Sequence, residues 1–200
     1  DLLVIGGGPA GTAAALRAAE LGATVAVAEE SRTGGTCVNS GCVPTRVLAK
    51  TARLMRDVRT ADSYGITVSQ QAVNWPVTVA QVRATVERVQ EAKDSVIICV
   101  GGHSRRLPIT GAELATLPEQ ILDLPSVPRR LAVVGAGNTG AQLVTVFGAL
   151  GAEVTLLEVA PRILAHTDAA VSAAVAQAFV EQGVRVETSL DGVVSLVRSD

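Results

Sequence analysis

The sequence predicts an α/β protein built from parallel β-sheets and the helices that connect their strands. Short apolar stretches alternate with longer amphipathic ones along most of the chain. Glycine-rich turns follow two of the apolar stretches, at residues 6–11 and 135–140. Hydrophobic residues make up 48% of the chain and aromatic residues only 2%, so the core must be aliphatic, as is typical of parallel sheets.

The first glycine turn lies in a complete strand–turn–helix–strand pattern. Residues 2–5 predict a strand, the turn 6–11 opens a helix that runs to about Leu21, and residues 24–28 predict the next strand. Glu29 follows that strand. A GxGxxG turn in this setting, with an acidic residue after the second strand, predicts a dinucleotide site rather than a plain glycine-rich turn.

Each glycine of this turn has a separate expected role. Gly6 makes the tight turn, Gly8 lets a pyrophosphate approach the backbone, and Gly11 lets the helix pack closely on the strand. The phosphates would lie at the helix N-terminus, and Glu29 would accept hydrogen bonds from ribose hydroxyls. The residues predicted to bind this nucleotide are Gly6, Gly8, Pro9, Ala10, Gly11, Glu29 and Glu30.

The same pattern recurs 129 positions later, which makes a chance match of either copy improbable. Gly135, Gly137 and Gly140 repeat the glycine spacing, and Glu158 repeats Glu29. Strands are predicted at 131–134 and around 154–157. Two dinucleotide sites in one chain imply two nucleotides, the arrangement needed to pass a hydride between them.

Two cysteines lie between the glycine turns. Cys37 and Cys42 are five positions apart, and Pro44 suits the first turn of a helix that starts near Cys42. The helix dipole would stabilise a thiolate at Cys42, and Arg46 adds positive charge. This pattern predicts a reactive thiol with a second thiol close by, although two inert, buried cysteines would also fit.

A zinc site is the weaker alternative for this pair. Structural zinc sites need four ligands at characteristic spacings, and the remaining candidates, Cys99, His103 and His166, do not supply them. We therefore predict no metal site. Cys99 is expected in the core, and both histidines in surface loops.

The other segments predict scaffold elements. A helix is expected from Pro76, with Val79, Val82, Val86 and Val89 on one apolar face. A buried strand is expected at 95–100. Residues 103–130 hold four prolines and predict a connection between domains. Thr167 or Asp168 would cap a helix that Gly183 ends. Strands at 184–188 and 193–197 would continue the second domain.

Composition excludes several classes of protein. The net charge of −2 offers no basic face for nucleic acid. The uncharged stretches at 2–16 and 131–152 fit neither a signal peptide nor a membrane span. Three cysteines do not make a secreted disulfide framework, so we expect a cytoplasmic protein. The chain starts without Met and ends just after a predicted strand, which predicts a fragment of a longer protein.

These motifs, in this order, resemble the pyridine nucleotide–disulfide oxidoreductases, such as dihydrolipoamide dehydrogenase, mercuric reductase and glutathione reductase. Residues 6–11 resemble the family's FAD fingerprint, residues 34–45 its redox disulfide motif, and residues 135–140 its NAD(P) fingerprint. Residues 97–102 stand in the place of its Ala-Thr-Gly strand but depart from that sequence, and the β-meander that usually precedes it is missing.

The resemblance implies two Rossmann-like dinucleotide-binding domains without the C-terminal part of the family fold. We expect an FAD domain at 1–110, a connection at 111–127, and an incomplete NAD(P) domain at 128–200. A homodimer is expected for the full-length protein. The family's catalytic His-Glu pair has no counterpart in this chain.

The implied activity is electron transfer from NAD(P)H through FAD to a Cys37–Cys42 disulfide, and on to a small or protein-bound disulfide or dithiol substrate. Cys42 would be the charge-transfer thiol and Cys37 the interchange thiol. NAD is expected rather than NADP, because Glu158 would repel a 2′-phosphate, although Arg162 lies close by in the sequence. The remaining residues expected at the cofactors are Gly35, Thr36, Arg46, Gly101, Gly135, Gly137, Asn138, Thr139, Gly140, Gln142 and Glu158.

Three positions depart from the family pattern. Arg46 replaces the usual Lys beside the flavin, Gln142 replaces its Glu partner, and Asn138 replaces an aromatic gate. An Arg without a carboxylate partner would raise the flavin potential.

Two other readings remain open. An FAD-dependent NADH oxidase or ferredoxin-reductase-type enzyme would share both nucleotide domains but not the cysteine pair. A non-catalytic nucleotide-binding fragment would share only the glycine turns.

Overall fold

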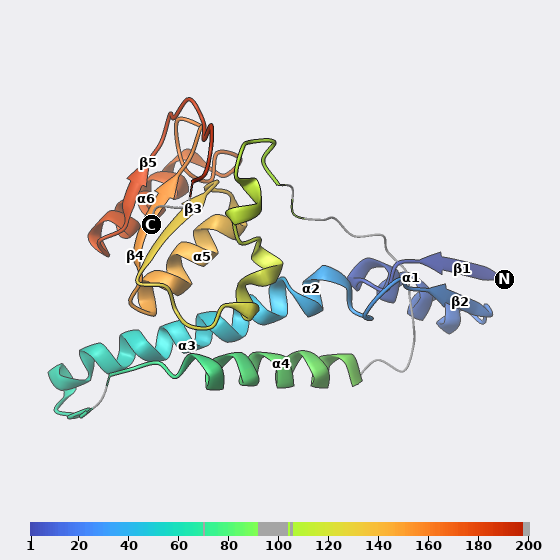
Figure 1. Ribbon diagram of the computed structural model, residues 1–200. Coiled ribbons are helices and arrows are strands. Elements are labelled where there is room, and N and C mark those ends of the chain that lie inside the picture. The colour runs from blue at the N-terminus through green and yellow to red at the C-terminus, as the bar shows by residue number, and fades with distance from the viewer. Residues whose placement is uncertain (70, 92–103, 105, 198–200) are drawn as a thin grey trace. The chain divides into compact units, whose positions relative to one another are not determined.

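The computed structural model describes residues 1–69, 71–91, 104 and 106–197 (Figure 1). Two compact units make up the chain. The first comprises Asp1–Val47, Val79–Arg106 and Leu117–Leu122, and the second comprises Leu48–Thr78, Leu107–Thr116 and Asp123–Asp200. The helices α3 (Cys42–Thr60) and α4 (Trp75–Glu91) each contribute to both units. The domain boundaries expected at residues 110 and 128 therefore stay predictions.

The first unit opens with the predicted strand–turn–helix–strand pattern. The strand β1 (Leu2–Ile5) leads through the glycine turn into α1 (Pro9–Glu20), and β2 (Val25–Ala28) pairs with β1 in parallel. Val4 and Ala15 are buried against each other, with Val25 and Val27 packed around them. Small and branched aliphatic side chains thus form this core, as the composition predicts.

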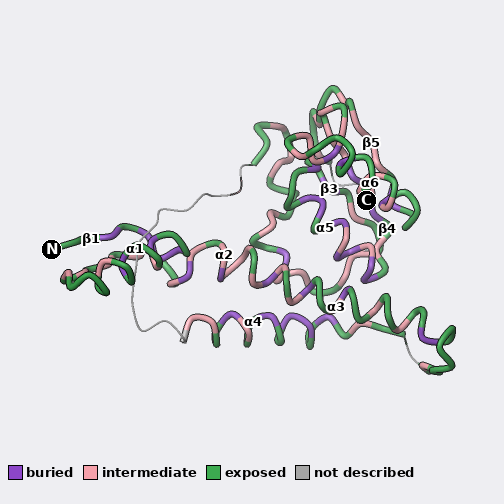
Figure 2. The backbone as a smooth tube through the Cα atoms, turned by 180° about the vertical axis from the view of Figure 1, so that it is seen from behind, coloured by how far each residue is buried: buried purple, intermediate pink, exposed green. Residues whose placement is uncertain are grey.

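Helices carry the rest of the first unit. A short helix that the sequence did not reveal, α2 (Gly35–Asn39), holds Cys37, and α3 begins at Cys42, where the sequence placed a helix start. The predicted apolar face of α4 is confirmed, because Val79, Val82 and Val86 are buried (Figure 2). Most of the 3-10 turn η3 (Pro118–Asp123) also lies in this unit, whereas the 3-10 turns η1 (Ala61–Tyr64) and η2 (Ala112–Leu114) belong to the second unit.

The second unit contains a parallel sheet in the order β3-β4-β5. Its strands are β3 (Arg130–Val134), β4 (Glu153–Leu157) and β5 (Arg185–Glu187), and its helices include α5 (Asn138–Ala149) and α6 (Ala169–Glu181). Asp168 caps α6 by accepting hydrogen bonds from Ala170 N and Val171 N, at 2.8 and 3.3 Å. The sheet with β1 and β2 is separate from this one, in agreement with two dinucleotide-binding folds.

Trp75 and Phe147 connect the helices of the second unit. Phe147 on α5 is 1% exposed, and its ring centroid lies 6.1 Å from that of Trp75 at an interplanar angle of 41°. The Trp75 indole Nε1 donates to Leu124 O at 2.7 Å. This satisfies the one polar group of a buried indole, so Trp75 can fill the core without an unpaired donor.

The strand predicted at 193–197 is wrong. Ser195 forms only an isolated bridge with Thr110, supported by Leu196 N donating to Thr110 O at 2.8 Å. Val194 and Val197 are 85% and 83% exposed. A strand needs a ladder of hydrogen bonds and a buried face, and this segment has neither. The strand predicted at 95–100, with Cys99, Gly101 and His103, lies outside the described residues.

Replacing Phe147 by Ala should destabilise the second unit by about 3–5 kcal/mol, because a large cavity would open in a packed core. Trp75 is the only tryptophan in the chain and packs on Phe147, so urea unfolding followed by its fluorescence measures this loss. Val180→Ala on α6 is the control, since Val180 is 61% exposed. Equal stability of the two variants would contradict the packing described here.

Candidate functional site

The first glycine turn has the geometry of a phosphate-binding loop. Gly6 has a positive φ of 103°, and its N–H donates to Ala28 O at 3.2 Å. Gly8 is extended and precedes α1, whose first residue is Pro9. No side chain caps this helix, and its first turn holds no acidic residue. Unpaired backbone N–H groups at a helix N-terminus favour an anion such as a pyrophosphate.

Glu29, which follows β2, binds this turn through its side-chain carboxylate. Its Oε2 accepts from Gly7 N, and its Oε1 accepts from Ser31 N at 3.1 Å. The hydrogen bonds from Gly7 and Ser31 hold the pKa of this carboxyl below its ordinary value of 4.5, although desolvation acts in the opposite direction. The carboxylate is therefore part of the fold, and each oxygen keeps a second lone pair for a ribose hydroxyl.

The second glycine turn repeats these hydrogen bonds. Gly135 has a φ of 97° and donates to Leu157 O at 2.8 Å. Glu158 Oε2 accepts from Ala136 N at 2.6 Å, and its Oε1 accepts from Ala160 N at 2.9 Å. Every donor and acceptor stands 129 positions after its counterpart in the first turn. The internal repeat seen in the sequence thus extends to individual hydrogen bonds.

The three glycines of the second turn are required for three different reasons. Gly135 needs its positive φ. A Cβ on Gly140 would lie 1.9 Å from Gly135 O, so only glycine lets α5 pack this closely. Gly137 has an ordinary φ of −73°, and a Cβ there would meet nothing within 4 Å. Neither conformation nor packing requires Gly137, so the open space before α5 fits the approach of a nucleotide's pyrophosphate.

The cysteine segment packs directly on the first glycine turn. Gly34 N donates to Gly7 O at 2.7 Å, and a Cβ on Gly35 would lie 2.9 Å from Gly8 Cα. Gly34 and Gly35 have φ values of 101° and 58°, which favour glycine. This contact places α2, with Cys37, beside the expected nucleotide site.

The two cysteines occupy different positions in adjoining helices. Cys37 is half-buried on α2, whereas Cys42 is exposed as the first residue of α3, and both are thiols in the structure. Gly41 O accepts from Thr45 N at 3.0 Å and from Thr45 Oγ1 at 2.8 Å, which fixes the first turn of α3. Cys42 therefore stands at a helix N-terminus, as the sequence indicated.

The other expected site residues differ in their elements and exposure. Pro9, Ala10 and Glu30 are exposed beside the first turn, and Asn138, Thr139 and Gln142 are exposed at the start of α5. Thr36 is exposed on α2, Arg46 is exposed one turn into α3, and His166 is exposed in a loop. Arg46 and Gln142 belong to different units, so their joint role at the flavin stays a prediction, as does the role of Gly101.

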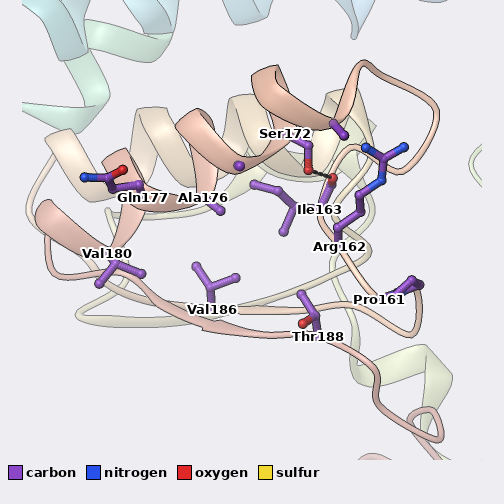
Figure 3. Close-up of a pocket in the computed structure, with 11 residues that line it drawn as sticks. Pro161, Arg162, Ile163, Ser172, Ala176, Gln177, Val180, Val186 and Thr188 are labelled. Carbon is purple, nitrogen blue, oxygen red and sulfur yellow. Dashed lines mark hydrogen bonds between the residues drawn. The ribbon is translucent and has the colours of Figure 1, made fainter.

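A separate cavity of about 370 Å³ lies between α6, β5 and the loop after β4 (Figure 3). Its lining is mostly aliphatic, from Ile163, Val180 and Val186. The Ser172 hydroxyl donates to Ile163 O at 2.6 Å, and Arg162 Nη2 donates to Ala165 O at 2.8 Å. None of the residues expected in the nucleotide sites lines this cavity, so we assign it no role in the site.

The described part of the chain contains no group of three His, Cys, Asp or Glu side chains arranged to hold a metal ion. None of its helices combines the length and hydropathy that a transmembrane span requires.

Residues 1–193 match the family described as Pyridine nucleotide-disulphide oxidoreductase. The chain belongs to this family. The resemblance seen in the glycine and cysteine motifs, and the predicted fold class, are thereby confirmed.

Two curated relatives of this chain are named dihydrolipoyl dehydrogenase. The chain is 33% identical to that of Zymomonas mobilis subsp. mobilis, over 94% of this chain and 49% of the relative. It is 31% identical to that of Bacillus subtilis, over 94% of this chain and 50% of the relative. The chain thus spans about half the length of the curated relatives it matches.

A solved structure confirms the fold. The Cu(II) complex of the HOCl-induced flavoprotein disulfide reductase RclA from Escherichia coli superposes with a TM-score of 0.80, at 22% identity, over 99% of this chain and 51% of the other. At this identity the likeness establishes the architecture alone.

We predict that Glu29→Gln destabilises the first unit at pH 7 and that the loss disappears in acid. Because the folded state lowers the pKa of Glu29, the carboxylate's stabilisation is present above its ordinary pKa and is lost as the pH falls through the folded-state pKa. Urea unfolding followed by circular dichroism at pH 7 and at about pH 3 measures the difference.

Glu30→Gln is the matched control, since Glu30 is the exposed neighbour of Glu29. A loss of the same size at both pH values would show that the Glu29 carboxylate does not act through its charge.

Proposed function

We propose that this chain is the nucleotide-binding half of an FAD-dependent NAD(P)H:disulfide oxidoreductase with Cys37 and Cys42 as its redox pair. The observation that carries the proposal is the packing of Gly34 and Gly35 on the first glycine turn. It anchors the cysteine segment to the nucleotide site itself. A thiol pair with a purely structural role would need no such contact.

The residues of both turns fit dinucleotides. The open space at Gly137 and the uncapped N-terminus of α1 each suit a pyrophosphate. FAD, when bound, would supply two-electron transfer between NAD(P)H and the cysteine pair. The net reaction would be NAD(P)H + H⁺ + RSSR → NAD(P)⁺ + 2 RSH, which runs in reverse for a dithiol substrate.

The cysteines would carry the thiol–disulfide exchange. In the reduced pair, the Cys37 thiolate would attack the substrate disulfide and release one RSH after protonation. Cys42 would then attack Cys37 in the mixed disulfide, release the second RSH, and leave the Cys37–Cys42 disulfide.

The alternative classes differ in their spectra. A flavin NADH oxidase or ferredoxin-reductase-type enzyme would be bleached by NADH, and a non-catalytic nucleotide-binding fragment would hold no stable flavin. A thiol-active flavoenzyme would instead show long-wavelength charge-transfer absorbance after two-electron reduction. The anchored cysteine pair favours the last of these.

Removing either cysteine should abolish disulfide reduction. We expect Cys37→Ser and Cys42→Ser to lower NADH-dependent disulfide reduction by more than about a hundredfold, while ferricyanide reduction through the flavin persists. Thiol counting provides the second measurement. The chain has three cysteines, so one titratable thiol after mild oxidation and three after reduction are expected. Three free thiols in the oxidised protein would overturn the proposed function.

We further propose NAD rather than NADP at the second site. Glu158, held by Ala136 N and Ala160 N, would place a negative charge where a 2′-phosphate would lie. The Arg162 guanidinium donates to Ala165 O within its own loop, so it is not aimed outward as a phosphate ligand would be. A homodimer and a cytoplasmic location also stay predictions for the full-length protein.

Glu158→Gln should shift the coenzyme preference toward NADPH. We expect the ratio of kcat/KM for NADH over NADPH to fall about tenfold, because a like-charge repulsion of about 1.4 kcal/mol is removed. Steady-state kinetics with both coenzymes measure it, with Glu153→Gln at the exposed start of the same strand as control. A wild-type preference for NADPH would refute the assignment.

A further inference from the structure

One side-chain network holds the cysteine segment from within. Asn39, the last residue of α2, directs its Nδ2 at three backbone carbonyls: Arg32 O at 3.2 Å, Thr33 O at 3.3 Å and Gly35 O at 3.0 Å. These carbonyls surround the turn at Gly34. The Asn39 amide therefore fixes the backbone that leads into α2.

The three carbonyls also determine which way the Asn39 amide faces. Carbonyl oxygens only accept hydrogen bonds, so the amide nitrogen must lie on their side and Oδ1 on the opposite side. Oδ1 then requires a donor of its own. Gln90 Nε2 supplies it at 2.6 Å and also donates to Thr33 O at 3.2 Å.

Gln90 belongs to α4, 51 residues further along the chain. All members of the network lie in the first unit. The sequence pattern of α4 indicated a scaffold helix with an apolar face, and Gln90 gives this helix a direct connection to the cysteine segment. Gln90 and Asn39 are both partly buried where they meet, so their hydrogen bond is shielded from water and costly to lose.

The position of Cys37 depends on such contacts. The helix α2 has only five residues, far fewer than a helix needs for stability by itself. Tertiary contacts must therefore hold α2. Two hydrogen bonds flank it, Gly34–Gly7 before the helix and Asn39–Gln90 at its end. Cys37 lies between them.

We propose that Gln90 is a positioning residue that, through Asn39, holds Cys37 in place for disulfide formation with Cys42. The proposal rests on the proposed function of the cysteine pair. A fixed α2 raises the effective concentration of the Cys37 thiol at Cys42, because less conformational entropy is lost when the disulfide closes. Without the Gln90 donor, α2 gains freedom in the reduced protein, and the disulfide becomes easier to reduce.

The test uses the full-length flavin-containing protein with Gln90→Glu and Gln90→Met. Glutamate keeps the shape of Gln90 but cannot donate, and methionine removes the donor without adding charge. Gln81→Glu and Gln81→Met are matched controls, since Gln81 is exposed on the same helix and its side chain makes no hydrogen bond within the described residues.

Two measurements report on the position of Cys37. The first is the equilibrium between the Cys37–Cys42 disulfide and dithiol in glutathione buffers, read by mass spectrometry after thiol trapping. We expect the constant for disulfide formation to fall at least threefold in both Gln90 variants and to stay at the wild-type value in both Gln81 variants. The second is the alkylation rate of Cys37 relative to Cys42, which should rise at least threefold as α2 loosens.

The outcomes separate this proposal from the function it rests on. If both Gln90 variants match their Gln81 controls in both measurements, Gln90 does not position Cys37. If the wild-type protein forms no Cys37–Cys42 disulfide in any buffer, the redox function is refuted instead. In that case an unchanged alkylation ratio would refute the contact between Gln90 and the cysteine segment as well.

Discussion

The structure of each glycine turn depends on one hydrogen bond, from the backbone N–H in the middle of the turn to a glutamate carboxylate. Gly7 donates to Glu29 in the first unit, and Ala136 donates to Glu158 in the second. The turn needs this acceptor because its N–H groups have no partner within a helix or a strand, and an unpaired buried N–H costs about 1–3 kcal/mol. The same carboxylate also accepts from the loop that follows the second strand, so it joins three segments.

The carbonyl of the same turn residue accepts a further hydrogen bond, and the two units differ in the segment that donates it. Gly7 O accepts from Gly34 N, and Ala136 O accepts from Leu164 N at 2.8 Å. In both units, one residue therefore binds the glutamate through its N–H and the incoming segment through its C=O. In the first unit that segment continues into the cysteine helices, whereas in the second it forms the loop with the buried Ile163. The two turns are thus alike, and the units differ in the segment attached to each turn.

Side-chain amides then fix the position of the cysteine segment. Asn39 satisfies carbonyls that the glycine turn at Gly34 leaves exposed, and Gln90 satisfies Asn39. When Asn39 Nδ2 pairs with the carbonyls, Asn39 Oδ1 still needs a donor, and Gln90 on α4 supplies it. The network therefore extends from the turn at Gly34 to α4. In the proposed function, this network would hold Cys37 on α2 in place relative to Cys42 on α3.

The sequence by itself determined the features that depend on neighbouring residues. Glycine spacing predicted both turns, because Gly6 and Gly135 need positive φ values that other residues disfavour. Pro44 and Asp168 predicted helix starts, because capping and proline geometry act within one turn. The tertiary structure alone decided what each side chain contacts. Four features depend on partners distant in the sequence. They are the hydrogen bonds from the turns to Glu29 and Glu158, the short helix α2, the Asn39–Gln90 hydrogen bond, and the segment 193–197, which forms no strand. Local conformational preference cannot specify such partners, because a donor finds its acceptor only after the chain has folded.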